Sequence, residues 1–248
     1  MGLTSAHWGV YEFAVKNGKI TEMKPFSEDP DPSPIGPSIV DLLNDPMRIT
    51  APAVRESWLN DGPGSAPEKR GSDPFIRVGW DEAEKLVAAE LARVRKTLGN
   101  QAIYAGSYGW ASAGRFHHAQ SQVHRFLNCL GGYTKSKNTY SYAAAEVIVP
   151  HVLGSFTRLL PQHTSWTNLA AHCELFVAFG GLVTDNGQIG NGGTGCHIQR
   201  DGIARSSGNG VEFVNISPRR VDIEAGVAPR WIPIRPNADT AMMLALCH

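Results

Sequence analysis

The strongest periodic signal in the chain is an amphipathic stretch over residues 81–98. Its apolar side chains recur at three- and four-residue spacing, which is the period of a helix with one buried face. Acidic residues lie near its start and basic residues near its end, as the helix dipole favours, and Gly99 follows as a stop signal. The pattern therefore predicts one long helix. Its apolar positions are Ala83, Leu86, Val87, Leu91, Val94 and Leu98.

Short apolar runs predict buried strands over residues 102–105, 174–179 and 211–216. A helix predicted over residues 115–130 follows the first strand, and residues 238–248 predict another helix. Strands that alternate with helices indicate an α/β fold with a doubly wound, mostly parallel sheet. In such a sheet, ligands bind at the carboxyl ends of the strands.

The N-terminal segment has a different pattern. Residues 11–15 and 19–23 flank Asn17-Gly18, which is a strong signal for a two-residue hairpin. Proline, aspartate and serine dominate residues 27–37 and predict a loop, and we expect a second loop over residues 60–73.

The change of pattern also predicts the domain organisation. We expect a small N-terminal β segment over residues 1–55 and an α/β domain over residues 56–248. The final helix is apolar but carries no stop signal before the chain ends. We therefore expect the α/β domain to be incomplete at its C-terminus and the chain to be a truncated portion of a larger multidomain protein.

Composition and charge exclude several classes of partner. The 248 residues include 23 basic and 23 acidic side chains, and this balance argues against nucleic acid and anionic membranes. No apolar run is long enough for a membrane span, and residues 1–16 carry no export signal. We expect a cytoplasmic protein, or a periplasmic one if a signal was removed. No cysteine pair has the CxxC spacing of zinc or iron–sulfur sites. The four cysteines are Cys129, Cys173, Cys196 and Cys247.

The turn after the first predicted strand carries two large aromatic residues. Tyr108 and Trp110 lie among small residues between Gly106 and Arg115, and glycines allow a backbone to approach a bulky ligand closely. Alone, this segment is more typical of an ordinary strand-to-helix turn with an aromatic plug, because glycine turns are common. Further blocks follow it in order: Gly131-Gly132-Tyr133-Thr134, Tyr140-Ser141, Pro150-His151-Val152-Leu153-Gly154 and Thr164-Ser165-Trp166.

In order and spacing, these blocks resemble the molybdenum-binding stretch of the dimethyl-sulfoxide reductase family, with its trimethylamine-N-oxide and biotin sulfoxide reductases. The similarity is close over residues 102–166 and looser over residues 75–248. It implies an oxidoreductase that reduces small S-oxides or N-oxides by oxygen-atom transfer. It also implies molybdenum bis(molybdopterin guanine dinucleotide) as cofactor, an electron-donor protein as partner, and the remainder of a longer enzyme. In such enzymes the cofactor performs the bond chemistry.

The resemblance assigns Ser141 as the protein ligand to molybdenum. A hard, high-valent metal prefers an anionic oxygen, which a serine alkoxide supplies. The alternative is that Ser141 is the N-cap of a helix that begins near Ala143.

The turn after the first strand matches the family's active-site aromatics. The hydroxyl of Tyr108 and the indole N–H of Trp110 can donate hydrogen bonds to an oxygen at the metal, and packing in the core is their alternative. Tyr108 favours S-oxide substrates, because trimethylamine-N-oxide reductases usually lack this tyrosine. Gly109 and Ser112 in the same turn are expected to contact the cofactor.

The later strand ends resemble the family's contacts with the dinucleotide parts of the cofactor. A carboxylate such as that of Asp239 can accept both guanine N–H donors, although Asp239 is equally suited to cap the last helix. The chain departs from the family pattern at Gly180-Gly181-Leu182-Val183, Ile216-Ser217-Pro218 and Asn138-Thr139, which indicates a divergent branch. The expected contacts are Thr184, Asp185, Asn186, Gln188, Ile216, Ser217, Arg220, Asn237 and Asp239.

Two other metal sites are not expected. Family members with an iron–sulfur cluster carry an N-terminal cysteine set, whereas no cysteine precedes Cys129 here, so we expect no iron–sulfur cluster. His117, His118 and His124 share a predicted helix but lack an acidic partner at zinc-site spacing. We expect these to be surface or core histidines.

Two other functions compete with the reductase. A chain of this length is a small part of such an enzyme, so we expect it to be inactive alone. A pseudo-oxidoreductase that acts as a binding or interaction module is therefore the main alternative. A nucleotide-binding domain without molybdenum is less favoured, because no GxGxxG motif opens the first helix of the α/β part.

Overall fold

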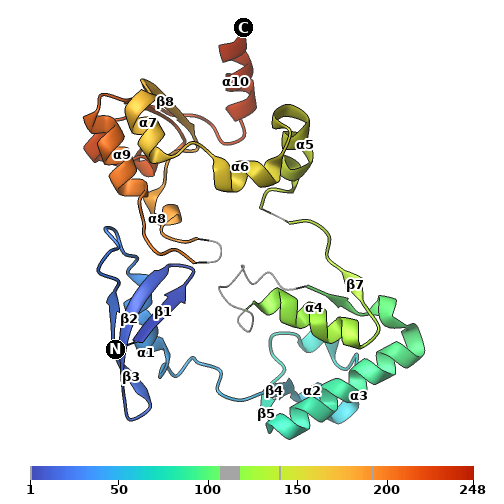
Figure 1. Ribbon diagram of the computed structural model, residues 1–248. Coiled ribbons are helices and arrows are strands. Elements are labelled where there is room, and N and C mark those ends of the chain that lie inside the picture. Colours follow the sequence, from blue (N-terminus) through green and yellow to red (C-terminus); the bar gives the residue numbers. More distant parts are fainter. Residues whose placement is uncertain (1, 107–117, 140, 191–192) are drawn as a thin grey trace. The chain divides into compact units, whose positions relative to one another are not determined.

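The chain forms two compact units (Figure 1). The computed structural model describes residues 2–106, 118–139, 141–190 and 193–248. Among the described residues, unit 1 contains residues 2–40 and those from 138 onward, and unit 2 contains residues 41–106 and 118–137. The N-terminal strands thus share a unit with the larger parallel sheet, while the domain boundary expected after residue 55 stays a prediction.

Unit 1 begins with a three-stranded antiparallel sheet in the order β1-β2-β3. Asn17 (φ 53°) and Gly18 (φ 74°) both adopt positive φ in the turn between β2 and β3, as an Asn-Gly hairpin requires. The predicted hairpin is confirmed, and β1 extends it to three strands. The strands are β1 (Gly2–Ala6), β2 (Gly9–Lys16) and β3 (Lys19–Pro25).

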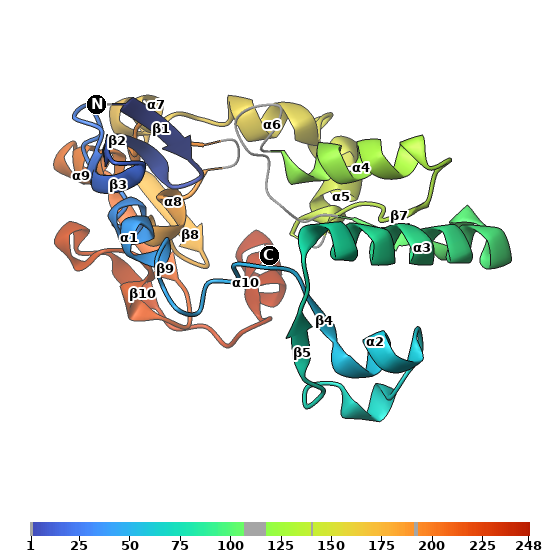
Figure 2. The same cartoon turned by 90° about the horizontal axis from the view of Figure 1, so that it is seen from below.

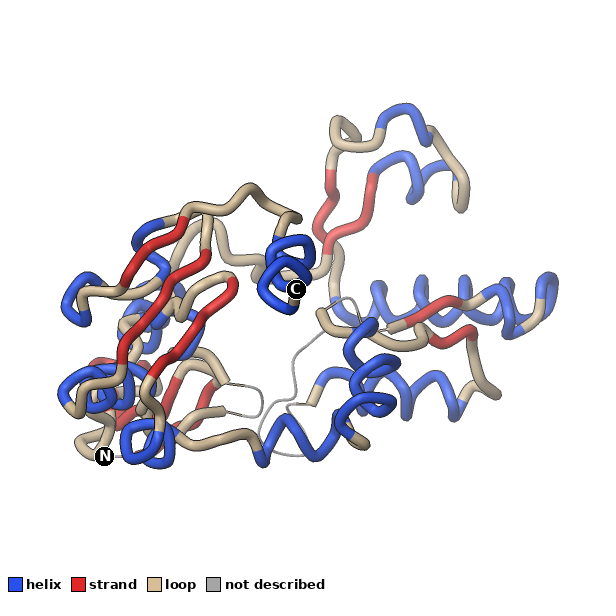
Figure 3. Tube along the Cα trace, turned by 90° about the horizontal axis from the view of Figure 1, so that it is seen from above, coloured by secondary structure: helices blue, strands red, loops and turns tan. Residues whose placement is uncertain are grey.

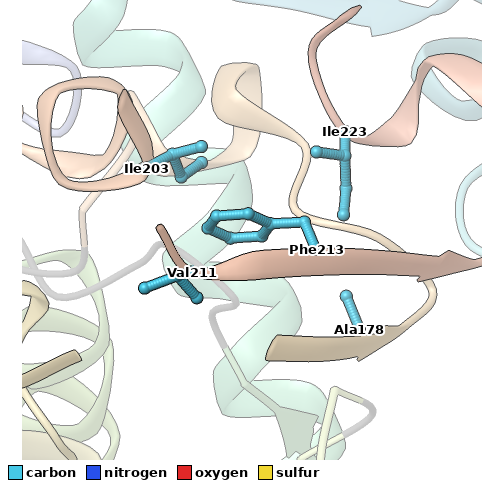
Figure 4. Packing of buried hydrophobic residues seen from close by; sticks show 5 residues of the cluster. All are labelled: Ala178, Ile203, Val211, Phe213 and Ile223. Carbon is cyan, nitrogen blue, oxygen red and sulfur yellow. The ribbon is translucent and has the colours of Figure 1, made fainter. Parts of the chain in front are cut away.

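The second sheet of unit 1 is parallel and carries the main apolar core. Its order is β10-β9-β8, with β9 in the centre. Ring stacking links Phe213 to Phe176 (5.6 Å between centroids) and Phe176 to Trp166 (6.0 Å). The strands are β8 (Leu175–Phe179), β9 (Glu212–Ile216) and β10 (Arg230–Ile232). Figure 4 shows the buried cluster of Ala178, Ile203, Val211, Phe213 and Ile223.

Helices α7 (Trp166–His172) and α9 (Gln199–Gly208) pack together beside this sheet. A Cβ atom on Gly202 would overlap the Trp166 indole, so only glycine allows the two helices this approach. The other helices of unit 1 are α1 (Ile35–Leu42), α5 (Ala143–Leu153), α6 (Phe156–Gln162), α8 (Thr184–Gly187), η3 (Arg220–Asp222), η4 (Ala225–Val227) and α10 (Asp239–Cys247).

Unit 2 contains α3 (Trp80–Leu98), which confirms the long helix that the apolar period predicts. Figure 2 and Figure 3 show a short parallel strand pair, β6 and β7, between α3 and α4. The Asn100 side-chain amide donates to the carbonyls of Leu130 (3.0 Å) and Gly132 (2.7 Å) and so ties this layer together. The other elements are β4 (Ala53–Arg55), α2 (Glu56–Asp61), η1 (Pro67–Lys69), β5 (Phe75–Arg77), η2 (Asn100–Ala102), β6 (Tyr104–Ala105), α4 (Ala119–Cys129) and β7 (Thr134–Lys135).

The described chain is α/β with an N-terminal β segment, as expected, but several elements differ in detail. Helix α1 occupies the end of the first expected loop, and α2 and η1 occupy parts of the second. The first strand of the α/β part is shorter than expected because η2 replaces its beginning, and it pairs with β7. None of the described helices combines the length and apolar character of a membrane span.

Candidate functional site

Two loops leave the parallel sheet of unit 1 at the same edge. Strands β8 and β9 run in the same direction with Phe179 opposite Ile216, so the residues that follow them lie at one end of the sheet. The Gly180 N–H donates to the Ile216 carbonyl (2.9 Å), and the Leu182 N–H donates to the Asp222 carbonyl (2.7 Å). The sequence predicted ligand contacts in these two loops.

Two consecutive glycines shape the loop after β8. Gly180 (φ 86°) and Gly181 (φ 81°) both adopt the left-handed conformation that favours glycine. A Cβ atom on Gly181 would meet Asp222, whereas no atom of the described residues lies within 4 Å of that position on Gly180. Gly181 therefore lets the two loops touch, and Gly180 leaves an open stretch of backbone that a ligand can approach.

A buried hydrogen-bond cluster holds the loop after β9. Ser217 and Asp222 are both buried, and the Ser217 hydroxyl donates to the Asp222 carboxylate. The Arg219 N–H donates to the Ser217 hydroxyl oxygen (3.2 Å), and the Trp231 indole N–H donates to the Ser217 carbonyl (2.8 Å). The polar groups of Ser217 are thus engaged inside the loop.

The expected dinucleotide contacts around this edge differ in exposure. Asp185 and Asn186 on α8 and Arg220 on η3 present exposed side chains. Ile216 is part of the buried interior of unit 1, and Ser217 is fully buried. The exposed side chains of Asp185, Asn186 and Arg220 can contact a ligand directly. The buried Ile216 and Ser217 side chains instead support the loops from the protein interior.

Thr184 belongs to a polar network that sequence reasoning missed. Its side chain is buried, and Oγ1 donates to Glu224 Oε1 (2.8 Å). Arg200 donates to the same oxygen through Nε (2.9 Å) and to Asp31 Oδ1 through Nη1 (3.1 Å). The four residues come from separate parts of the chain, so no local pattern in the sequence announces them.

Asn215 is a second residue that sequence reasoning missed. It is fully buried in β9, and its Nδ2 donates to the carbonyls of Arg219 and Arg220, both at 3.2 Å. Its Oδ1 has no hydrogen-bond partner among the described residues. An amide inside an apolar strand is the signal that could have found it, because buried polar groups need partners.

Ser141 lies in the segment before α5, in the same unit as the two strand-end loops. It is exposed, and its N–H donates to Thr139 Oγ1 (3.3 Å). Tyr142 occupies the N-cap of α5, and no side chain makes a cap hydrogen bond there. The alternative that Ser141 caps this helix is therefore wrong.

Asp239 is the first residue of α10 and is half-buried. Ala238 occupies the N-cap, again without a side-chain cap hydrogen bond, so the alternative that Asp239 is the cap is also wrong. The preceding Asn237 is exposed and adopts a positive φ of 68°. This turn brings Asp239 into the first turn of the helix, where the dipole favours a carboxylate.

The turn predicted to hold the active-site aromatics lies outside the described residues, which applies to Tyr108, Gly109, Trp110 and Ser112. In the part of the chain that is described, no group of three or more His, Cys, Asp or Glu side chains is placed to hold a metal ion. His124 stacks on Tyr133 and is hydrogen-bonded to it through Nδ1.

Comparison with known proteins decides the family. The profile of molybdopterin oxidoreductases matches residues 48–248, and that of the molybdopterin oxidoreductase N-terminal domain matches residues 4–43. The chain belongs to the molybdopterin oxidoreductase family. The resemblance carried by the ordered sequence blocks is thereby confirmed.

Curated relatives of this molybdopterin oxidoreductase chain are named as S-oxide or N-oxide reductases. It is 42% identical over 224 residues, or 90% of the chain, to biotin sulfoxide reductase of Cereibacter sphaeroides. It is 35% identical over 246 residues, or 99% of the chain, to dimethyl sulfoxide/trimethylamine N-oxide reductase of Rhodobacter capsulatus. With trimethylamine-N-oxide reductase of Haemophilus influenzae the identity is 32% over 249 residues, again 99% of the chain. The chain spans 30% of the length of each of these relatives.

Membership in the molybdopterin oxidoreductase family implies a molybdenum–pterin cofactor. The residues at the edge formed by the loops after β8 and β9 are chemically suited to part of such a cofactor. Gly180 offers open backbone, and the exposed carboxylate, amide and guanidinium belong to Asp185, Asn186 and Arg220. Such groups supply the acceptors, donors and positive charge that a nucleotide with phosphates requires.

Proposed function

We propose that the protein to which this chain belongs reduces S-oxides or N-oxides by oxygen-atom transfer, with molybdenum bis(molybdopterin guanine dinucleotide) as its cofactor. The observation that carries the proposal is the 42% identity with a biotin sulfoxide reductase over 90% of the chain. The other relatives, named as dimethyl sulfoxide and trimethylamine N-oxide reductases, match almost the whole chain. A small S-oxide or N-oxide is therefore the proposed substrate.

Ser141 provides the proposed protein ligand to the metal. Its side chain is exposed and belongs to the unit that carries the strand-end loops, and an alkoxide oxygen suits a hard, high-valent metal. The bound cofactor supplies two-electron redox chemistry at that metal.

Tyr108 and Trp110 are the proposed donors to the substrate oxygen. The phenol and the indole each carry one donor, and donors aimed at developing charge lower the barrier for its transfer. Gly109 and Ser112 contact the cofactor in the same turn. Tyr108 favours S-oxide over N-oxide substrates in this proposal.

Exposed and half-buried polar groups hold the dinucleotide parts of the cofactor. They are Asp185, Asn186, Arg220, Asn237 and Asp239, with Asp239 accepting the guanine N–H donors. Three buried side chains support these groups from the protein interior, namely those of Thr184, Ile216 and Ser217. No cysteine precedes Cys129, which supports a protein without an iron–sulfur cluster.

The remainder of the longer protein and an electron-donor protein are the proposed partners. Large cofactors are enclosed on several sides by protein, and this chain covers 30% of the length of its relatives. A catalytically incomplete chain that acts as a binding module is the second candidate, and the same observation of length favours it.

Cofactor analysis combined with turnover tests both candidates. The full-length protein, purified from a host that makes the pterin, should contain molybdenum and guanine-bearing pterin, with two pterins for each metal. With a reduced viologen as electron donor, it should reduce dimethyl sulfoxide or biotin sulfoxide. A protein that binds pterin but turns over no S-oxide or N-oxide favours the binding module, and a protein without molybdenum or pterin contradicts the proposal.

A further inference from the structure

A buried aspartate–histidine pair lies outside the proposed cofactor contacts. Asp29 Oδ2 and His197 Nδ1 are 2.6 Å apart, and their side chains are 1% and 2% exposed. His197 Nε2 lies 2.9 Å from the Gln188 carbonyl. Both ring nitrogens therefore face oxygens, one from the Asp29 carboxylate and one from the Gln188 main chain.

The second carboxylate oxygen of Asp29 is also occupied. Oδ1 accepts the main-chain N–H groups of His197 (3.0 Å) and Asp31 (3.2 Å). The pair is thus fully hydrogen-bonded, which is the condition under which a buried ion pair is stable. Removal of either partner leaves a buried group without its counterpart.

The pair joins the N-terminal segment to the loop between α8 and α9. Asp29 follows β3. Gln188 ends the α8 turn that carries the proposed contacts Thr184, Asp185 and Asn186, and His197 lies between this turn and α9. Lesser links run in parallel within unit 1. The Gly190 N–H donates to the His7 carbonyl (2.7 Å), and Gln188 Nε2 donates to the Asp31 carbonyl (3.2 Å).

These links differ in strength. The Arg200–Asp31 ion pair, which joins α9 to the N-terminal segment, has an arginine side chain 46% exposed, and exposed pairs contribute little. The Asp29–His197 pair is enclosed by protein, where breaking a pair is costly because one charge stays buried. It is therefore the main attachment of the loop to the N-terminal segment.

We propose that Asp29 and His197 are positioning residues that fix the α8 turn, residues 184–188, against the N-terminal segment so that this turn can hold the dinucleotide part of the cofactor. The cofactor part of this proposal rests on the proposed function. The pair touches no ligand itself. It acts through Gln188, whose carbonyl it binds at the end of the turn.

Hydrogen–deuterium exchange of the full-length protein tests the attachment. The reporter is the amide of Gly190, because its own acceptor, the His7 carbonyl, is unchanged by substitution of Asp29. Asp29→Ala should increase exchange at Gly190 by roughly a hundredfold, as expected for a buried ion pair that loses one partner. Exchange at Phe213 in β9 should not change.

Two further variants separate positioning from general loss of stability. Asp29→Asn keeps an acceptor for both main-chain N–H groups, and its amide can donate to His197 Nδ1, so it should restore most of the protection. Asp73→Ala is the matched control, since Asp73 is a buried carboxylate that accepts from Ser57 N and Oγ in unit 2. It should leave exchange at Gly190 unchanged.

Pterin content of the same preparations tests the link to the cofactor. Asp29→Ala should lower pterin per protein at least about fivefold, and Asp29→Asn should recover it. Unchanged exchange at Gly190 in Asp29→Ala overturns the attachment, and faster exchange with full pterin overturns the positioning role. Wild-type protein without pterin contradicts the proposed function, whereas the exchange result still decides whether the pair holds the loop.

Discussion

Gly181 lies directly against Asp222, and a Cβ atom built on Gly181 would come within 2.9 Å of the Asp222 carbonyl oxygen. The same carbonyl accepts the N–H of Leu182 at 2.7 Å. The contact joins the loops that follow β8 and β9, and the Asp222 side chain in turn holds Ser217. One residue without a side chain therefore sets how closely the two parts of the candidate site approach.

We predict that Gly181→Ala destabilises the protein more than Gly180→Ala. Both positions have positive φ, so alanine costs about 1–2 kcal/mol of backbone strain at either. Only Gly181 meets a neighbour, and overpacking there adds roughly 1–3 kcal/mol. Thermal unfolding of the two variants measures the difference. Equal shifts in the unfolding midpoint would show that the loops separate without cost.

Ser141→Ala should remove the proposed metal ligand from the full-length protein. The molybdenum absorption spectrum should change, and turnover of S-oxides should fall by orders of magnitude, because the oxygen ligand is lost. Ser155→Ala is the matched control, since the Ser155 side chain caps α6 by accepting the Arg158 N–H. That variant should lose about 1 kcal/mol of stability and keep the wild-type spectrum. A normal spectrum and activity in Ser141→Ala would contradict the ligand assignment.

The elements that the sequence predicted are those whose signal is local. Helix α3 shows its apolar period within one stretch of chain, and the hairpin is encoded by Asn17-Gly18. Helix α9 shows no such period, because its buried face consists of Gly202, Ile203 and Ser206. Gly202 becomes a core residue there because the Trp166 indole packs against it, and the buried Ser206 hydroxyl donates to the Gly202 carbonyl. Strand β10 has three residues, which is too short for a periodic pattern.

The same distinction applies to the candidate site. The parallel strands indicate that ligands bind after their carboxyl ends, and residues 184–188 and 217–222 do lie at one edge. The groups that hold these loops were not predictable, because their partners are distant in sequence. Asp29 and His197 are 168 residues apart, and Thr184 and Glu224 are 40 residues apart.

Asp239→Ala should lower cofactor occupancy with little effect on stability. The side chain does not cap α10, so the expected stability loss is the dipole interaction of about 0.3–1 kcal/mol. Pterin content and thermal unfolding of the same preparation separate the two effects. Asp81→Ala is the control, because Asp81 lies in the first turn of α3, in the other unit. Full pterin occupancy in Asp239→Ala would rule out guanine recognition by this carboxylate.

The Asp29 carboxylate should make the stability of the protein depend on pH in the acid range. Burial raises the pKa of the Asp29 carboxyl, but hydrogen bonds from the His197 main chain and ring and from the Asp31 N–H outweigh it. The net pKa lies below the ordinary value. A carboxyl with a lowered folded-state pKa contributes stability that is present above its unfolded-state pKa and is lost as pH falls through the folded-state pKa.

Asp29→Asn should therefore make the free energy of unfolding less dependent on pH in the acid range. The unfolded-state pKa of an aspartate is about 3.9, so wild-type protein should lose stability with a steeper slope than the variant as pH falls below about 4. Above that pH the free energies of unfolding of the two proteins should change with pH in the same way. The pKa of Asp73 is also lowered, first by its hydrogen bond from Ser57, so Asp73→Asn should make the stability of unit 2 less dependent on pH in the same range. Exchange measured separately at the Gly190 amide and on amides of α3 assigns each effect to its unit. A Gly190 response to pH that is identical in wild type and Asp29→Asn would show that the Asp29–His197 pair does not stabilise this part of unit 1.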